Sequence, residues 1–304
     1  MTLLRLTRAI KLAAVPALIA SLLSGCSGLD TLNAMLLAQD HPVAAGIAYG
    51  PDARQKLDVH RPADGPADGP ADGAAHPVVV FFYGGGWKGG ERGQYAFVAE
   101  ALVRHGYVVV VPDYRLYPAV QFPAFIEDGA KAVRWVRENI RAYGGDPERL
   151  FIAGHSAGAH LGAMLAVNGD YLRAEGVQPD SVKGFVGLAG PYAFDPSDYK
   201  STRDIFASAK HIRDTQPVNF VTPAAPPMAL LHGAGDGTVY PLNSQELAKA
   251  LRKNSVPVRH IEYPETGHIE ILLAFYPALA GIPLIEDVVG ALQDFEGGSL
   301  SARR

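Results

Sequence analysis

Residues 150–168 read Leu-Phe-Ile-Ala-Gly-His-Ser-Ala-Gly-Ala-His-Leu-Gly-Ala-Met-Leu-Ala-Val-Asn. The apolar run 150–153 predicts a buried strand, and residues 157–168 predict a helix. Between them lies Gly154-His155-Ser156-Ala157-Gly158, a Gly-x-Ser-x-Gly motif in the strand-to-helix context that a nucleophile elbow requires. A tight, strained turn there would lift the serine hydroxyl clear of the sheet. Ser156 is therefore the candidate nucleophile.

The sequence on either side of this motif alternates between apolar strands and helices. Predicted strands lie at 78–82, 108–111, 150–153, 182–188, 228–232 and 258–263. Predicted helices lie at 95–105, 125–143, 157–168, 244–254 and 282–296, and Gly144 is expected to end the second of them. Strands that are apolar throughout are typical of a sheet covered on both faces. The pattern predicts an α/β fold with a mostly parallel, doubly wound sheet and helices on both faces.

Three further segments complete the expected domain, which spans residues 51–304. Residues 54–60 alternate in polarity and predict an edge strand. Residues 62–74 hold three copies of Pro-Ala-Asp-Gly, which lack a hydrophobic face and predict an expanded loop. Residues 191–222 show no clear periodicity and are expected to form a small cap.

A serine hydroxyl needs a base, and that base needs an acid to orient it. His268 follows the last predicted strand and is the candidate base, whereas His232 ends a strand and could line a pocket. Asp236 follows the strand at 228–232 and is the candidate acid; Glu265 and Asp195 are the alternatives. Glu265 is too close in sequence to His268 to orient it from the next strand end, and Asp195 belongs to the expected cap. The chain order is therefore Ser…Asp…His.

Tyr83-Gly84-Gly85-Gly86-Trp87 follows the predicted strand at 78–82. Successive glycines let backbone N–H groups approach a ligand closely. Donors aimed at a developing oxyanion are worth about 3–4 kcal/mol each. We expect Gly84, Gly85 and Ala157 to form an oxyanion hole.

Residues that flank these motifs are candidates for contact with a substrate or for structural support. Tyr83, Trp87 and His155 are assigned to the substrate-binding site. Arg115, in Asp113-Tyr114-Arg115, could contact an acidic substrate, but a structural ion pair at the end of a strand is favoured.

These motifs resemble those of the α/β-hydrolase superfamily, near its hormone-sensitive-lipase-like and feruloyl-esterase-like carboxylesterases. The resemblance runs from about Gln55 to Leu292 and includes Phe122-Pro123-Ala124 and Gly144-Gly145-Asp146-Pro147. It implies hydrolysis of short-chain acyl esters through an acyl-serine intermediate. That family usually has a histidine where this chain has Tyr83, and a tyrosine hydroxyl could support the glycine loop in the same way.

Two other functions compete with ester hydrolysis. The stretch 155–161 is also similar to that of kynurenine formamidases, which implies an amide substrate. A non-catalytic binding lipoprotein is the third possibility, although such a protein would normally have lost a triad residue, and none is missing. A small-molecule ester is the expected partner.

Composition excludes several other classes of protein. About 48% of the residues are hydrophobic and 19% are charged, which excludes an intrinsically disordered chain. The net charge of −4 and the lack of a basic cluster argue against nucleic acid as a partner. The sequence has no His-Glu-x-x-His motif, no cysteine cluster and no phosphate-binding loop, so neither a metal nor a cofactor is expected.

The N-terminal segment has the features of an export signal. Arg5, Arg8 and Lys11 precede an apolar run at 12–23, which is too short to span a bilayer comfortably. Leu23-Ser24-Gly25-Cys26 holds the sole cysteine of the chain and resembles the lipobox of bacterial lipoproteins. That resemblance implies that residues 1–25 are a signal peptide and that Cys26 is lipidated. Residues 26–50 would then form a tether with a short helix, anchored in a bacterial cell envelope, at the outer membrane and facing the periplasm.

Overall fold

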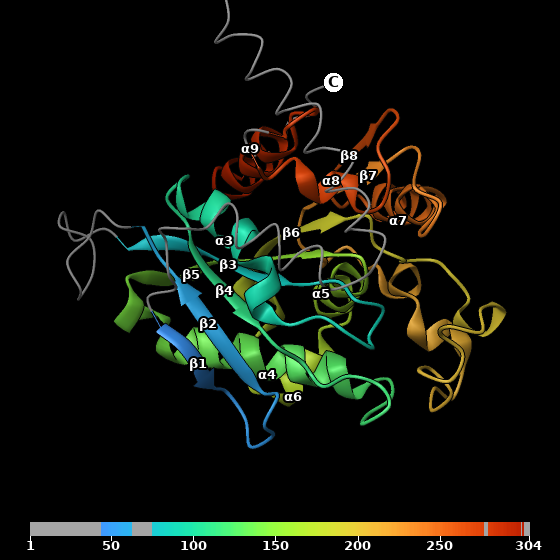
Figure 1. Cartoon of the computed structure of the whole chain (residues 1–304), viewed down its shortest axis with the longest axis horizontal. Helices are drawn as coiled ribbons and strands as arrows, with labels where there is room; N and C mark the ends of the chain where they lie inside the picture. Colours follow the sequence, from blue (N-terminus) through green and yellow to red (C-terminus); the bar gives the residue numbers. More distant parts are fainter. Residues whose placement is uncertain (1–43, 63–74, 277–278, 299, 301–304) are drawn as a thin grey trace, which may run out of the picture.

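The computed structural model describes residues 44–62, 75–276, 279–298 and 300 (Figure 1). In these residues eight strands form one sheet in the order β1-β2-β4-β3-β5-β6-β7-β8. The strands are β1 Ala44–Ala48, β2 Lys56–His60, β3 His76–Phe82, β4 Val108–Pro112, β5 Gly145–His155, β6 Val182–Leu188, β7 Met228–Gly233 and β8 Val258–Tyr263. Strands β3 to β8 pair in parallel, whereas β1 and β2 are antiparallel to their neighbours. The predicted α/β class with a mostly parallel sheet is confirmed.

The antiparallel edge differs from the expectation in one respect. Residues 44–48 fall within the segment predicted to be a tether, but they form β1, which pairs with β2. Strand β2 is therefore not the edge of the sheet, and its side chains from Leu57 to His60 are buried. The predicted signal peptide, Cys26, residues 27–43 of the predicted tether and repeat residues 63–74 lie outside the described residues.

Helices cover both faces of the sheet, as predicted. The α-helices are α3 Ala96–Val103, α4 Ala124–Asn139, α5 Ala157–Val167, α6 Asp170–Ala174, α7 Leu242–Lys253, α8 Glu270–Leu273 and α9 Leu284–Glu296. Helices α3 and α9 contact each other, whereas α4 contacts α5 and α6. Figure 1 shows α9 above the sheet and α4 with α6 below it. The short helices α6 and α8 were not predicted, because one turn leaves no periodic signal in the sequence.

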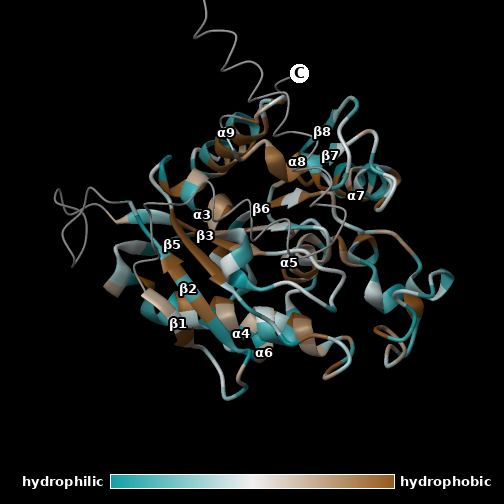
Figure 2. Cartoon of the chain, in the orientation of Figure 1, coloured by the Kyte–Doolittle hydropathy of each residue, from teal (hydrophilic) through white to brown (hydrophobic). Residues whose placement is uncertain are grey.

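The central strands are buried between these two helical layers. Every residue of β4 is buried, as are residues 78–82 of β3. In Figure 2 the central strands are largely coloured as hydrophobic. Burial of apolar surface, worth about 25 cal/mol per Å², therefore fixes the sheet as a rigid platform. After α4 and a 3₁₀ turn, Gly144 adopts a φ of 78° and ends the helical segment at the predicted residue.

The segment 191–222 contains three 3₁₀ turns, Pro196–Asp198, Ile212–Thr215 and Pro217–Phe220, and neither an α-helix nor a strand. Two of its residues anchor it to the domain. The carbonyl oxygen of Thr215 lies 2.7 Å from Nε2 of His160, which is on α5. Phe206 packs edge-on against Trp87 at 4.9 Å between ring centroids. Within the described part of the chain, no helix is long and apolar enough to cross a membrane.

Candidate active site

Ser156 lies at the turn between β5 and α5, with φ 54° and ψ −122°. This positive φ is costly for a serine, about 1–3 kcal/mol, and the packing of the turn must hold it. A Cβ at Gly158 would lie 2.1 Å from the Phe82 carbonyl oxygen, so only glycine allows α5 to approach β3 so closely. The structure thus shows the strained elbow that the sequence predicted at Ser156.

Three side chains from three loops form a continuous hydrogen-bonded chain. Ser156 Oγ lies 2.8 Å from His268 Nε2, and His268 Nδ1 lies 2.6 Å from Asp236 Oδ2. Because a carboxylate only accepts, Nδ1 carries the proton, which leaves Nε2 free to accept the serine hydroxyl. Ser156, Asp236 and His268 follow β5, β7 and β8, which end at the same edge of the parallel sheet. The structure therefore brings the three predicted residues together in the geometry of a catalytic triad.

Asp236 is held by its own loop as well as by His268. Its Oδ1 accepts the backbone N–H groups of Thr238 and Val239, each at 2.8 Å. His232 Nε2 lies 3.3 Å from Oδ2. Burial opposes the negative charge, but hydrogen bonds from His232 and His268 outweigh burial and hold the pKa of Asp236 well below its ordinary value. Asp236 is therefore ionised at neutral pH.

His232 supports the acid loop and does not line the cleft. Its side chain is fully buried, with Nε2 2.9 Å from the Val239 carbonyl oxygen and Nδ1 2.7 Å from Ser244 Oγ. The carbonyl and the Asp236 carboxylate can only accept, so the single Nε2 hydrogen is shared between them, and the Ser244 hydroxyl donates to Nδ1. The position of His232 at a strand end was visible in the sequence, but its contacts depend on the path of the loop 234–241 and on the start of α7.

The glycine loop approaches Ser156 after the end of β3. Gly85 has a φ of 135°, which favours glycine, and its carbonyl accepts the N–H groups of Lys88 and Gly89 in a tight turn. Gly85 lines the cleft beside Ser156, whereas Gly84 and Ala157 are buried and do not line it. Ala157 opens α5, where unpaired N–H groups and the helix dipole favour negative charge. An oxyanion hole formed by these three residues stays a prediction.

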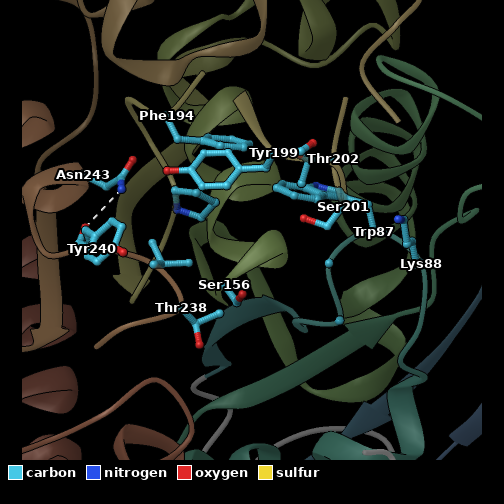
Figure 3. A pocket seen from close by; sticks show the side chains of 14 residues that line it. Trp87, Lys88, Ser156, Phe194, Tyr199, Ser201, Thr202, Thr238, Tyr240 and Asn243 are labelled. Carbon is cyan, nitrogen blue, oxygen red and sulfur yellow. Dashed lines mark hydrogen bonds between the residues drawn. The ribbon is translucent and has the colours of Figure 1, made fainter. Parts of the chain in front are cut away.

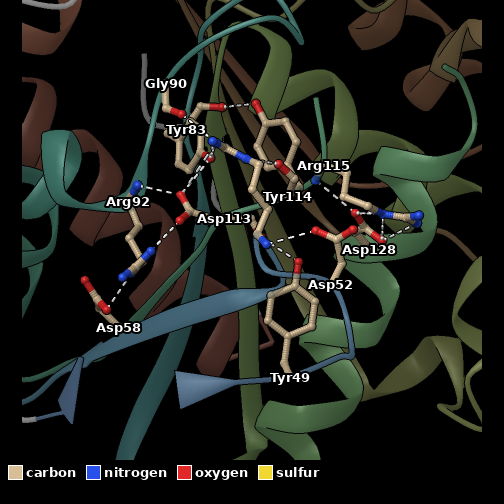
Figure 4. Close-up of polar contacts among 11 residues, drawn as sticks. Tyr49, Asp52, Asp58, Tyr83, Gly90, Arg92, Asp113, Tyr114, Arg115 and Asp128 are labelled. Atoms are coloured by element: carbon tan, nitrogen blue, oxygen red, sulfur yellow. Dashed lines mark hydrogen bonds and ion pairs between the residues drawn. The ribbon is translucent and has the colours of Figure 1, made fainter. Parts of the chain in front are cut away.

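Tyr83 lies in the protein core before the glycine loop and does not line the cleft, contrary to its assignment as a substrate-binding residue. The Tyr83 side chain is fully buried, and its hydroxyl donates to Asp113 Oδ1 at 2.8 Å (Figure 4). Arg54 Nη2 donates to the same hydroxyl at 2.8 Å and to the Gly90 carbonyl at 2.6 Å. The Tyr83 hydroxyl therefore has no direct hydrogen bond to Gly84–Gly86; it is linked through Arg54 to the Gly90 carbonyl, which follows the glycine loop.

Arg115 forms a structural ion pair, as favoured from the sequence. Its Nη2 lies 2.7 Å from Asp128 Oδ1, and Asp128 is fully buried. Gln55 Nε2 donates to the same carboxylate oxygen at 2.7 Å. Figure 4 shows Arg115 directed at Asp128, and Arg115 does not line the cleft.

His155 is also buried and does not line the cleft, which corrects its assignment to substrate binding. Its Nε2 lies 3.0 Å from the main-chain carbonyl oxygen of His268 and must donate to it. The two imidazole rings are 4.8 Å apart. Burial, and then the neighbouring His268, lower the pKa of His155 to about 3, so this side chain is neutral at ordinary pH. His155 therefore ties the base loop to the elbow.

A cleft of about 250 Å³ opens above Ser156 (Figure 3). Trp87 lies in its wall, as expected, and stacks on Phe194 of the segment 191–222 at 5.9 Å between ring centroids. The other lining residues, which sequence reasoning missed, include Tyr199, Thr238, Tyr240 and Asn243. The segment 191–222 and the loop after β7 thus build two walls of the cleft, and neither has a periodic pattern that would reveal this.

The sequence of the chain is similar to those of several named esterases. It is 31% identical over 241 residues to esterase LipC of Mycobacterium tuberculosis, covering 73% of this chain and 58% of that protein. It is 30% identical over 279 residues to esterase LipQ of the same species, covering 85% of this chain and 64% of that protein. An isoprenylcysteine alpha-carbonyl methylesterase of Arabidopsis thaliana is 27% identical over 282 residues, covering 85% of this chain and 64% of that protein. The chain thus spans about three-fifths of the length of these curated relatives.

Solved structures share the fold. A truncated carbohydrate esterase from gut microbiota superposes with a TM-score of 0.69 at 20% identity, over 84% of this chain and 96% of that one. Esterase 2 of Thermogutta terrifontis superposes with a TM-score of 0.68 at 22% identity, over 84% of this chain and 95% of that one. Together with the sheet order and the elbow, these likenesses define the α/β-hydrolase fold. The chain belongs to the BD-FAE family, whose model matches residues 67–251.

Proposed function

We propose that this protein is a carboxylic ester hydrolase that cleaves short-chain acyl esters through an acyl-serine intermediate. The observation that carries the proposal is the Ser156–His268–Asp236 hydrogen-bonded chain at the floor of an open cleft. The esterase names of the relatives support the same reaction class. They give no support to the formamidase alternative, and an intact triad argues against a non-catalytic binding protein.

In the proposed mechanism each group takes one step. His268 Nε2 takes the proton from Ser156 Oγ as this oxygen attacks the ester carbonyl carbon. Backbone N–H groups of the glycine loop and of Ala157 stabilise the oxyanion of the tetrahedral intermediate. His268 then gives its proton to the departing alkoxide, which leaves an acyl-serine. Water attacks this acyl group by the same sequence and releases the acid, while Asp236 stabilises the imidazolium throughout.

A series of 4-nitrophenyl esters from acetate to octanoate tests this function on the purified protein. We expect turnover of the short esters, with kcat/KM falling as the acyl chain outgrows the cleft. N-formylkynurenine, assayed in parallel, should be hydrolysed far more slowly. Hydrolysis of the formamide alone would overturn the proposal in favour of an amidase.

His155 provides a prediction about how the base is positioned. His155→Leu removes the donor to the His268 carbonyl, and we expect kcat to fall by about 10², the usual cost of a misplaced catalytic group. His155→Gln can place an amide N–H near the position of Nε2 and should recover most of the activity. Thermal unfolding of both variants checks that each is folded. Equal kcat values in the two variants would show that the hydrogen bond does not position the base.

We further propose that the protein is a lipoprotein of a bacterial cell envelope, anchored through Cys26 at the outer membrane and facing the periplasm. The basic residues before the apolar run 12–23, and the lipobox-like Leu23-Ser24-Gly25-Cys26, support this location. The residue after the cysteine is Ser27 and not an aspartate. In Gram-negative lipoproteins, the absence of an aspartate at this position implies sorting to the outer membrane. Each buried CH₂ of an acyl chain adds about 0.8 kcal/mol, and stable anchoring requires more than one chain.

Metabolic labelling with a palmitate analogue tests the anchor. Wild-type protein should take up the label and sediment with membranes. The Cys26→Ala variant should neither take up the label nor sediment with membranes, and its intrinsic turnover should be unchanged. Unlabelled, soluble wild-type protein would contradict the lipobox interpretation and leave an ordinary signal peptide.

A further inference from the structure

The two ends of the cleft differ in chemistry. Figure 3 shows Lys88, with Ser201 and Trp87, at one end of the cleft, and Tyr240 with Asn243 at the other, with Ser156 between them. Lys88 is the sole charged side chain among the described residues that line the cleft. The rest of the lining is uncharged: aromatic, aliphatic or hydroxylic side chains, glycine and the amide of Asn243. No lining carboxylate therefore neutralises this cation.

Lys88 is fixed close to the reacting centre by its backbone. Its N–H donates to the Gly85 carbonyl at 3.1 Å, in the same turn that brings Gly85 beside Ser156. Its side chain is exposed, and its ammonium lies 5.5 Å from the centre of the Tyr117 ring. Among the described residues, no acidic side chain forms an ion pair with it. The loop that would polarise the ester therefore also places a positively charged side chain at one end of the cleft.

We propose that Lys88 is a specificity-determining residue that selects esters carrying an anionic group, such as a carboxylate, away from the scissile bond. The inference rests on the proposed function. The chain as a whole has a net charge of −4, so the overall charge of the protein would not attract an anionic ester, and the selection would come from the local charge of Lys88. The exposed Ser201 hydroxyl, at the same end of the cleft, offers a second donor to such a group.

Two pairs of esters test this selection, each matched in size. The acyl pair is mono(4-nitrophenyl) adipate and its methyl ester; the alcohol pair is 4-acetoxybenzoate and its methyl ester. The measured quantity is the kcat/KM of the anionic ester divided by that of its neutral partner. Comparing this ratio between variants cancels intrinsic reactivity and the folded fraction of each preparation.

We expect Lys88→Met to lower the ratio about fivefold for at least one pair, mainly by raising the KM of the anionic ester. This is the change that loss of an exposed ion pair worth about 1 kcal/mol would produce. Lys88→Glu should lower it further, and added salt should lower the wild-type ratio but not that of Lys88→Met. Lys183→Met makes the same charge change at the amino end of β6, whereas the active site lies at the carboxyl ends of the strands. This control should leave the ratio unchanged.

A ratio that is equal in wild type and Lys88→Met for both pairs would overturn the proposal, as would an equal decrease in Lys183→Met. Failure of the proposed function would look different, because wild-type protein would then hydrolyse neither the neutral nor the anionic esters.

Discussion

Ser156→Ala is expected to lower kcat for 4-nitrophenyl acetate by on the order of 10⁶-fold, as loss of the nucleophile does in other serine hydrolases. Alanine fits the elbow and removes only Oγ, so His268 loses the hydroxyl that lies 2.8 Å from Nε2. The residual rate should come from the cleft and the backbone donors alone. Steady-state turnover, corrected for spontaneous hydrolysis, measures the loss.

The fold of Ser156→Ala should be unaffected or slightly more stable, since the elbow keeps its packing. Circular dichroism and thermal unfolding check this point. A folded Ser156→Ala protein that retains even a tenth of the wild-type kcat would remove Ser156 from the mechanism.

Asp236→Asn is expected to lower kcat by about 10⁴-fold with little change in the fold. The amide can no longer carry the charge that stabilises the His268 imidazolium. Its NH₂ group also favours the tautomer in which Nδ1 accepts, and Nε2 then holds a proton and cannot act as the base. The kcat between pH 6 and 9 measures the effect.

Asp195→Asn is the matched control for Asp236→Asn. Asp195 was the rival acid in the sequence, and in the structure its Oδ1 accepts from the backbone and hydroxyl of Ser197. Its replacement should leave kcat within a few-fold of wild type. If the two variants lost activity equally, Asp236 would not be the orienting acid.

The sequence was sufficient to predict the three triad residues because each follows a recognisable strand; β5 and β7 end in apolar runs, whereas β8 alternates between apolar and polar residues. Ser156, Asp236 and His268 lie just beyond β5, β7 and β8, and parallel strands bring such positions to one edge. The sheet was predictable for the same reason. Strand β1 was not, because a short, half-buried edge strand such as Ala44–Ala48 has little periodicity.

The supporting residues could not be predicted from adjacency in the sequence. Tyr83 and His155 adjoin catalytic motifs, which suggested contact with a substrate, yet both side chains point into the protein. Their partners, Asp113 and the His268 carbonyl, lie 30 and 113 residues away. The cleft walls were hidden for a related reason, since Phe194 and Tyr240 belong to irregular loops whose paths depend on the whole fold.

The most direct test of the catalytic assignment is covalent labelling with a fluorophosphonate, followed by peptide mass spectrometry. A fluorophosphonate reacts with a serine that an adjacent base has activated. Wild-type protein should acquire one adduct, on Ser156, and Ser156→Ala should acquire none. Absence of an adduct from folded wild-type protein, or an adduct on another serine, would contradict the account.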